Sequence, residues 1–146
     1  MTEPGASAVT WEAQLRARGL KLTPQRRAIL CYLDGNGSHP TAAEVFAAVT
    51  RDFPMASRAT VYNTLSLLVE IGAVRSVPGL PGGDTRFDPK VSHHHHVMCP
   101  RCGAIADLDA AHVQVTVGGV APQLRGLTAH VRFEQTCATC ASPTSR

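Results

Sequence analysis

The stretch His93-His94-His95-His96-Val97-Met98-Cys99-Pro100-Arg101-Cys102-Gly103 places four imidazoles and two thiols within ten positions. Side chains of a strand alternate between its two faces, so His94 and His96 share one face and His93 and His95 share the other. The strand leads into Cys-x-x-Cys, a spacing that lets one tight turn bring two thiolates to the same ion. A run of four histidines is also typical of a tag remnant or a solvated loop. Directly before Cys-x-x-Cys in mid-chain, it indicates a metal-binding protein.

A second Cys-x-x-Cys follows at Cys137 and Cys140. Together with Cys99 and Cys102 it offers four thiolates from two turns, which is the ligand set of a closed tetrahedral zinc site. Because no ligand position stays open, we expect a structural Zn²⁺ that ties the C-terminal strand to the preceding hairpin. A redox-active disulfide pair is the alternative. The fifth cysteine, Cys31, is expected to be a small buried side chain within a helix, with a redox role as its alternative.

Length and composition set broad limits. A chain of 146 residues forms one ordinary domain or two small ones, and a net charge of +3 allows a nucleic-acid partner without requiring one. The sequence has no apolar run long enough to span a membrane and no signal peptide, so we expect a cytoplasmic protein without a membrane partner. In that reducing compartment, paired Cys-x-x-Cys motifs favour zinc over disulfides.

The first part of the chain predicts a winged-helix DNA-binding domain over residues 1–88, with a disordered tail at 1–9. Capping signals at Thr23-Pro24, Thr41-Ala-Ala-Glu44 and Ser57 start three of its helices. The expected helices are Thr10–Arg18, Pro24–Asp34, a third from the Thr41 capping box to about Thr50, and Arg58–Ile71, followed by strands Ala73–Val77 and Thr85–Asp88.

The last of these helices has two unlike faces. Its core arc holds Val61, Thr64, Leu65, Leu68 and Ile71, whereas its opposite arc holds Ala59, Tyr62, Asn63, Ser66 and Glu70. An exposed Tyr-Asn pair in the first turns suits base edges and phosphates, although a polar solvated face is the alternative. In the context of a winged helix we predict DNA contacts from a set of five residues: Lys21, Arg58, Thr60, Tyr62 and Asn63.

The second part, residues 93–146 after a hinge at 89–92, predicts a small α/β domain. Its expected elements are a hairpin of His94–Cys99 and Gly103–Leu108, a short helix within Ala110–Arg125 and a strand Leu127–Gln135, so the fold class is α+β.

With the cysteines assigned to zinc, the histidines call for a second metal. His94 and His96 supply two nitrogens, and three more donors are available: Asp107 across the hairpin, and Asp88 and His39 from the first domain. A mixed nitrogen and oxygen set suits Fe²⁺ or Mn²⁺ at least as well as Zn²⁺ and binds more reversibly than four thiolates, as a regulatory site requires. Closing this site would fix one domain against the other. Taken singly, His39 is also consistent with a loop residue and Asp107 with a surface carboxylate.

These segments together resemble the ferric uptake regulator (Fur) family. The resemblance is carried by Gly19–Arg27, His39–Glu44, Ser57–Leu65, Arg86–Asp88, His94–His96 with Cys99-x-x-Cys102-Gly, and Cys137-x-x-Cys140. It implies a metal-dependent transcriptional repressor, not an enzyme, that binds operator DNA (an AT-rich inverted repeat) as a homodimer through its C-terminal dimerisation domain.

Within the family the chain is most similar to the peroxide-sensing PerR branch. That branch's three histidines and two aspartates fall on the predicted set, and Asn63 also matches it, whereas iron-sensing members tend to carry glutamate in place of Asp88 and Asp107. The resemblance implies that peroxide reacting at bound Fe²⁺ oxidises His39 or His94 and releases the DNA, and that Mn²⁺ supports repression without this chemistry.

Some features leave alternatives open. Ala110–Arg125 is glycine-rich where the family has a regular helix, which affects the expected dimer interface. An accessory third metal site could use His93, His95, His112 and His130, but Gln114 stands where a glutamate ligand is expected. Other functional readings are an iron- or manganese-uptake regulator without peroxide sensing, a mononuclear metalloenzyme, which lacks an obvious general base, and a zinc-ribbon interaction module.

Overall fold

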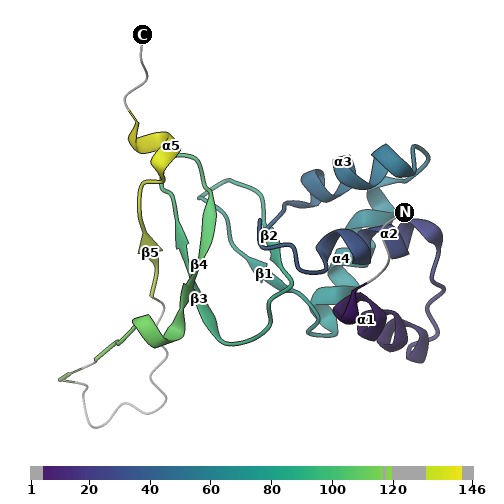
Figure 1. Cartoon of the computed structure of the whole chain (residues 1–146), viewed down its shortest axis with the longest axis horizontal. Helices are drawn as coiled ribbons and strands as arrows, with labels where there is room; N and C mark the ends of the chain where they lie inside the picture. The colour runs from purple at the N-terminus through teal and green to yellow at the C-terminus, as the bar shows by residue number, and fades with distance from the viewer. Residues whose placement is uncertain (1–4, 117, 120–130, 143–146) are drawn as a thin grey trace. The chain divides into compact units, whose positions relative to one another are not determined.

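The computed structural model describes residues 5–116, 118–119 and 131–142. The chain forms two compact units, Met1–Ser92 and His93–Arg146. The first unit is mainly helical and the second is built on a small sheet, so the α+β class is confirmed (Figure 1). None of the helices in the described residues has the length and apolar character needed to cross a bilayer.

The first unit consists of helices and a two-stranded ribbon. Strands β1 and β2 pair antiparallel, with Arg75 opposite Asp88 and Val77 opposite Arg86. The elements run in the order α1 (Ala6–Ala17), α2 (Pro24–Leu33), α3 (Ala42–Asp52), α4 (Arg58–Glu70), β1 (Arg75–Val77) and β2 (Arg86–Asp88). Helices followed by a ribbon are the winged-helix plan.

The predicted helix starts are confirmed by their hydrogen bonds. The side chain of Thr23 accepts from the backbone N–H of Arg26, and that of Ser57 accepts from Thr60. Thr41 and Glu44 form a reciprocal capping box at the start of α3. At the other end of α4, Gly72 adopts φ +72°, the left-handed conformation that a helix C-terminus favours and that glycine adopts at no steric cost.

The prediction of a frayed end at residues 1–9 is wrong for residues 6–9, which belong to α1. Helix α1 has no side-chain N-cap, so its start carries no local sequence signal. Instead, Ala8 is fully buried, and its backbone N–H donates to Oδ2 of Asp34 at 3.1 Å. A contact distant in sequence therefore holds the first turn.

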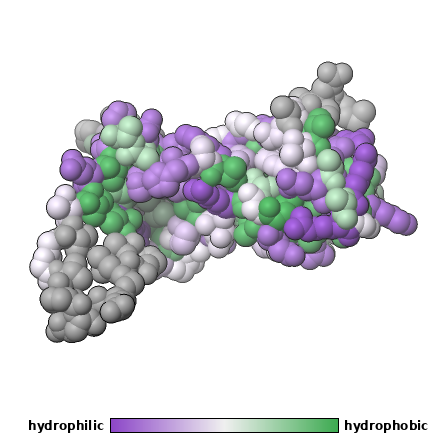
Figure 2. All heavy atoms as spheres, turned by 90° about the horizontal axis from the view of Figure 1, so that it is seen from below, coloured by the Kyte–Doolittle hydropathy of each residue, from purple (hydrophilic) through white to green (hydrophobic). Residues whose placement is uncertain are grey.

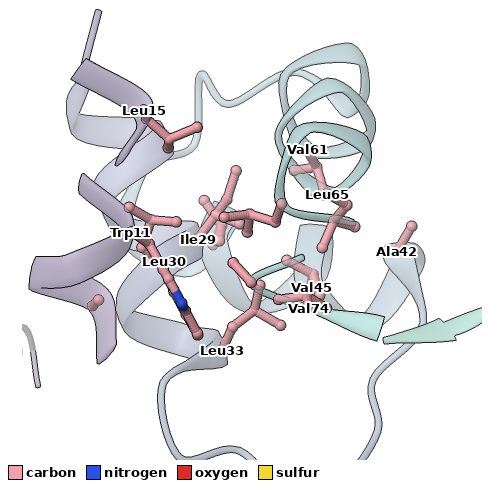
Figure 3. Packing of buried hydrophobic residues seen from close by; sticks show 14 of the residues in the cluster. Trp11, Leu15, Ile29, Leu30, Leu33, Ala42, Val45, Val61, Leu65 and Val74 are labelled. Atoms are coloured by element: carbon pink, nitrogen blue, oxygen red, sulfur yellow. The ribbon is translucent and has the colours of Figure 1, made fainter. Parts of the chain in front are cut away.

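The hydrophobic core lies in the first unit. Figure 3 shows side chains of α1, α2 and α4 pointing toward one interior, among them Trp11, Leu30 and Leu65. Leu30 is completely buried, and so are Ile29 and Leu33 of the same helix. The apolar spacing of these helices, at i, i+3 and i+4, places them on the buried face.

The second unit is a three-stranded sheet of order β4-β3-β5. Strand β3 (His94–Met98) pairs antiparallel with β4 (Ile105–Asp109) and parallel with β5 (Phe133–Glu134). Two further elements are a 3₁₀ turn, η1 (Ala110–His112), and α5 (Ala138–Ala141), which was not predicted. Of the helix expected within 110–125, the described residues contain only η1. Positions 127–130 of the expected strand lie outside the described part of the chain.

This unit has little apolar interior. Among its described residues, only His94, Met98, Cys99 and Gly103 are buried. Figure 2 shows hydrophobic residues among hydrophilic ones on the surface, and Val115 and Val131 are about half exposed (53% and 49%). Hydrophobic burial alone therefore contributes little to the stability of the described part of this unit.

Candidate metal centres

Four cysteines converge at one end of the small sheet. Their sulfur atoms all lie within 4.8 Å of one another, and the Sγ atoms of Cys102 and Cys137 are 3.6 Å apart. Four thiolates at about 2.3 Å from a tetrahedral zinc ion would be separated by roughly 3.8 Å. The arrangement thus fits a closed Zn²⁺ site and leaves no position for a substrate.

Local structure explains how the two pairs meet. Cys99 and Cys102 lie in the turn between β3 and β4, where the N–H of Gly103 donates to the carbonyl of Cys99 at 2.9 Å. Cys137 is the N-cap of α5, and its N–H donates to Sγ of Cys99 at 3.4 Å. The parallel pairing of β5 with β3 brings the second pair beside the first.

The thiols differ in their tendency to ionise. Hydrogen bonds from the backbone N–H groups of Cys137 and Cys102 lower the pKa of Cys99 to about 6. Interaction with the sulfur atoms of Cys102 and Cys137 raises the pKa of Cys140 to about 12. Cys99 therefore ionises readily, whereas ionisation of Cys140 requires a compensating cation such as a metal ion.

A second group of donors lies on β3 and β4. His96 stands directly opposite Asp107 in the strand register. The Nε2 atoms of His94 and His96 are 3.0 Å apart, and Oδ1 of Asp107 lies 3.4 Å from His94 Nε2 and 3.9 Å from His96 Nε2. Two imidazole nitrogens and a carboxylate oxygen thus point to one place, as the strand alternation predicted.

The first unit brings together the other two predicted ligands. His39 Nε2 lies 3.9 Å from Oδ1 of Asp88, and both side chains are almost completely buried (1% and 2% exposed). The loop that carries His39 runs along β2, where Phe87 N–H donates to the carbonyl of Pro40 at 2.9 Å. Burying an imidazole and a carboxylate together is costly unless they bind each other or a cation.

Each unit therefore contains part of the predicted ligand set, which we call a half-set: His39 with Asp88 in the first unit, and His94 with His96 and Asp107 in the second. These nitrogen and oxygen donors are of the type that suits Fe²⁺ or Mn²⁺. That the two half-sets share one ion stays a prediction. The sequence did not indicate one residue beside this pair: the guanidinium of Arg86 donates to the carbonyl of His39 at 3.0 Å. Its position two residues before Asp88 was the available signal.

The remaining histidines behave as their strand positions suggest. The rings of His93 and His95 lie on the other face of β3 with centroids 5.3 Å apart, and His95 also contacts the ring of Phe133. His112 is exposed at the end of η1. His130 lies outside the described residues, so the possible third site stays a prediction.

Helix α4 presents the expected arcs. Val61, Thr64, Leu65 and Leu68 are buried, whereas the opposite arc, including Asn63, is exposed and Tyr62 is 51% exposed. Lys21 is also exposed. The other two predicted DNA contacts make local interactions: the Arg58 guanidinium lies over the ring of Phe46, 4.6 Å from its centroid, and the Thr60 hydroxyl is 2.9 Å from that of Ser57.

Cys31 is only partly buried and lines a cavity of about 360 Å³ between α2 and α3, together with Tyr32 and Val49. Burial and the negative charge of Glu12 raise the pKa of its thiol. A thiol with a raised pKa is a weak nucleophile at neutral pH, which favours packing over a redox role.

Comparison with known proteins places this geometry in context. The sequence profile of the ferric uptake regulator family matches residues 17–131. The peroxide-responsive repressor PerR of Staphylococcus saprophyticus is 46% identical over 95 residues, which are 64% of this chain and 62% of that protein. The match thus spans less than two thirds of the relative.

Solved structures agree on the fold. The Helicobacter pylori ferric uptake regulator, a protein with three functional metal-binding sites, superposes with a TM-score of 0.72 at 17% identity, covering 99% of this chain and 100% of that one. PerR from Streptococcus pyogenes superposes with a TM-score of 0.55 at 27% identity, covering 94% and 95%. The family consists of transcriptional regulators and not of enzymes. The chain belongs to the ferric uptake regulator family.

Proposed function

We propose that this chain is a metal-dependent transcriptional repressor of the peroxide-sensing type, which acts in the cytoplasm and binds operator DNA as a homodimer. The observation that carries the proposal is the pair of half-sets, His39 with Asp88 and His94 with His96 and Asp107, each preassembled within its own unit. The similarity to peroxide-responsive repressors supports the same function.

In this proposal the five side chains hold one Fe²⁺ or Mn²⁺ ion and thereby fix the first unit against the second. DNA affinity then follows metal occupancy, because only the metal-bound geometry spaces the two reading helices of a dimer for the operator. An Fe²⁺ ion held by these five side chains would supply the redox chemistry that peroxide requires, whereas Mn²⁺ in the same place would not. Oxidation of His39 or His94 would remove a nitrogen donor from the ion. The ion would then no longer fix the first unit against the second, and the protein would dissociate from the DNA.

We propose that the exposed arc of α4 is the surface that binds DNA. Tyr62 and Asn63 would reach base edges, and Arg58, Thr60 and Lys21 would position the helix against phosphates. The operator we expect is an AT-rich inverted repeat, which matches the two-fold symmetry of a homodimer. The four cysteines would hold a structural Zn²⁺ throughout.

We expect His39→Ala and Asp88→Ala to abolish Mn²⁺-dependent operator binding, because each removes a buried donor from the first unit. The measurement is fluorescence anisotropy of labelled AT-rich inverted-repeat DNA with and without Mn²⁺. Asp84→Ala is the matched control, since Asp84 is an exposed aspartate in the turn before β2, and it should bind like the parent protein. Unchanged Mn²⁺ dependence in both test variants would contradict the proposal.

Peroxide sensing is separable from metal dependence. After exposure of the Fe²⁺-loaded protein to micromolar peroxide, we expect mass spectrometry of peptides to find one added oxygen atom on His39 or His94, and no addition on the Mn²⁺-loaded protein. If neither histidine gains oxygen, the chain is instead an iron- or manganese-uptake regulator of the same family.

A further inference from the structure

We propose that Arg86 is a positioning residue that holds His39 in the conformation required for metal binding. The inference rests on the proposed function of His39 and Asp88 as metal ligands. Arg86 itself touches neither the imidazole ring nor the carboxylate in the contacts described above. It acts through the backbone of His39 and through the start of helix α3.

The side chain of Arg86 joins two elements that are distant from it in sequence. Its Nη1 donates to the carbonyl of His39 at 3.0 Å and lies 3.5 Å from Oε2 of Glu44. The same carboxylate oxygen accepts from the backbone N–H of Thr41 at 2.6 Å, within the capping box of α3. The Arg86 side chain is only 20% exposed, whereas that of Glu44 is 54% exposed, so the bond to the His39 carbonyl is the better shielded of the two contacts.

The backbone of the same strand continues this attachment. Arg86 forms an antiparallel bridge with Thr41, and the next residue, Phe87, donates its N–H to the carbonyl of Pro40. Residues 39–41 thus lie along β2 as a short additional edge. Because Asp88 is two residues beyond Arg86 on the same strand, Arg86 fixes the distance between the His39 loop and the carboxylate.

His39 needs such support because of its own backbone conformation. It is the only non-glycine residue with positive φ in the described part of the chain, at +52°. A non-glycine residue stays in this sparsely populated region only where the surrounding structure over-determines it. The charged hydrogen bond from Arg86 to the His39 carbonyl and the capping box at Thr41 hold the backbone on either side of the imidazole. Without the Arg86 bond, the loop would relax and the imidazole would turn away from Asp88.

The test is a pair of substitutions, Arg86→Lys and Arg86→Gln, in the zinc-loaded protein of 146 residues. Loss of an outer-shell partner of a metal ligand typically weakens metal binding by about 10–100-fold. We expect the Mn²⁺ dissociation constant, measured by calorimetry, to rise in that range for both variants. The ammonium of lysine lies one atom nearer the backbone than Nη1 of arginine, so it should not reach the His39 carbonyl in the same geometry and should not restore full affinity.

A second readout separates positioning from general stability. In Fe²⁺-loaded Arg86→Lys treated with peroxide, the fraction of oxygen added at His39 should fall relative to that at His94, since only His39 is displaced. The zinc content and the thermal midpoint should stay close to those of the parent. A merely structural role would lower the midpoint and affect both histidines equally. Should Arg86→Gln fail to fold, the lysine variant carries the test.

Arg75→Lys is the matched control. Arg75 lies on the neighbouring strand β1 and also donates to a backbone carbonyl, that of Val91, at 2.6 Å. It should retain parental Mn²⁺ affinity. The role of Arg86 is overturned if Arg86→Lys binds Mn²⁺ within twofold of the parent while His39→Ala does not bind it. If His39→Ala also retains full affinity, the proposed metal site fails, and the role of Arg86 fails with it.

Discussion

Replacement of Cys137 by serine should release zinc and unfold the second unit while leaving the first unit folded. Structural zinc sites in small domains provide about 10–16 kcal/mol of apparent binding free energy at neutral pH, and this energy is coupled to folding. The described part of the second unit buries only four residues, and one of them, Cys99, is itself a predicted zinc ligand. No comparable source of stability remains there once the ion has left.

The measurement combines zinc content by elemental analysis with circular dichroism and two-dimensional NMR. Sheet resonances of the second unit should collapse, whereas helical signals persist, because the hydrophobic core runs from Ala8 to Val74. Cys31→Ser removes a cysteine from a helix of the first unit and should keep its zinc. A Cys137→Ser protein with full zinc content and a native sheet would show that the four cysteines do not form the site.

Truncation of Leu30 to alanine should lower the free energy of unfolding of the first unit by about 2–5 kcal/mol. Leu30 is completely buried in α2. Its removal leaves a cavity among tightly packed side chains, which can collapse only in part. Because single domains are stable by about 5–15 kcal/mol, this is a large share of the total.

Urea denaturation followed by tryptophan fluorescence measures this loss, since Trp11 is the single tryptophan of the chain and lies in the same core. Val9→Ala is the control. Val9 is 54% exposed in α1, so its truncation should change the unfolding free energy by no more than about 0.5 kcal/mol. Equal effects of the two substitutions would mean that Leu30 is not a core residue in solution.

The features that could be predicted from sequence are those with local causes. Thr23, Thr41 and Ser57 mark helix starts because a side-chain oxygen satisfies a backbone N–H three residues later. The pairing of His96 with Asp107 follows from strand alternation and the short turn between Cys99 and Cys102.

The features that could not be predicted depend on contacts between distant segments. The first turn of α1 is held by Asp34, 26 residues beyond Ala8. The left-handed conformation of His39 is maintained by Arg86, 47 residues away. Neither contact leaves a periodic pattern or a capping motif in its own segment, because each is a hydrogen bond between segments that are distant in sequence. The short helix α5 is similar, because its N-cap residue, Cys137, donates its N–H to Sγ of Cys99, 38 residues away.

The attachment of β5 has a consequence for the protein without zinc. Among the described residues, two pairs join it to β3, Val97 with Phe133 and Met98 with Glu134. When zinc leaves and the second unit begins to unfold, β5 should detach first and leave β3 as an open sheet edge. An open edge presents unpaired backbone donors and acceptors to other chains and is a site of aggregation. Zinc would therefore protect the protein from self-association as well as stabilise its fold.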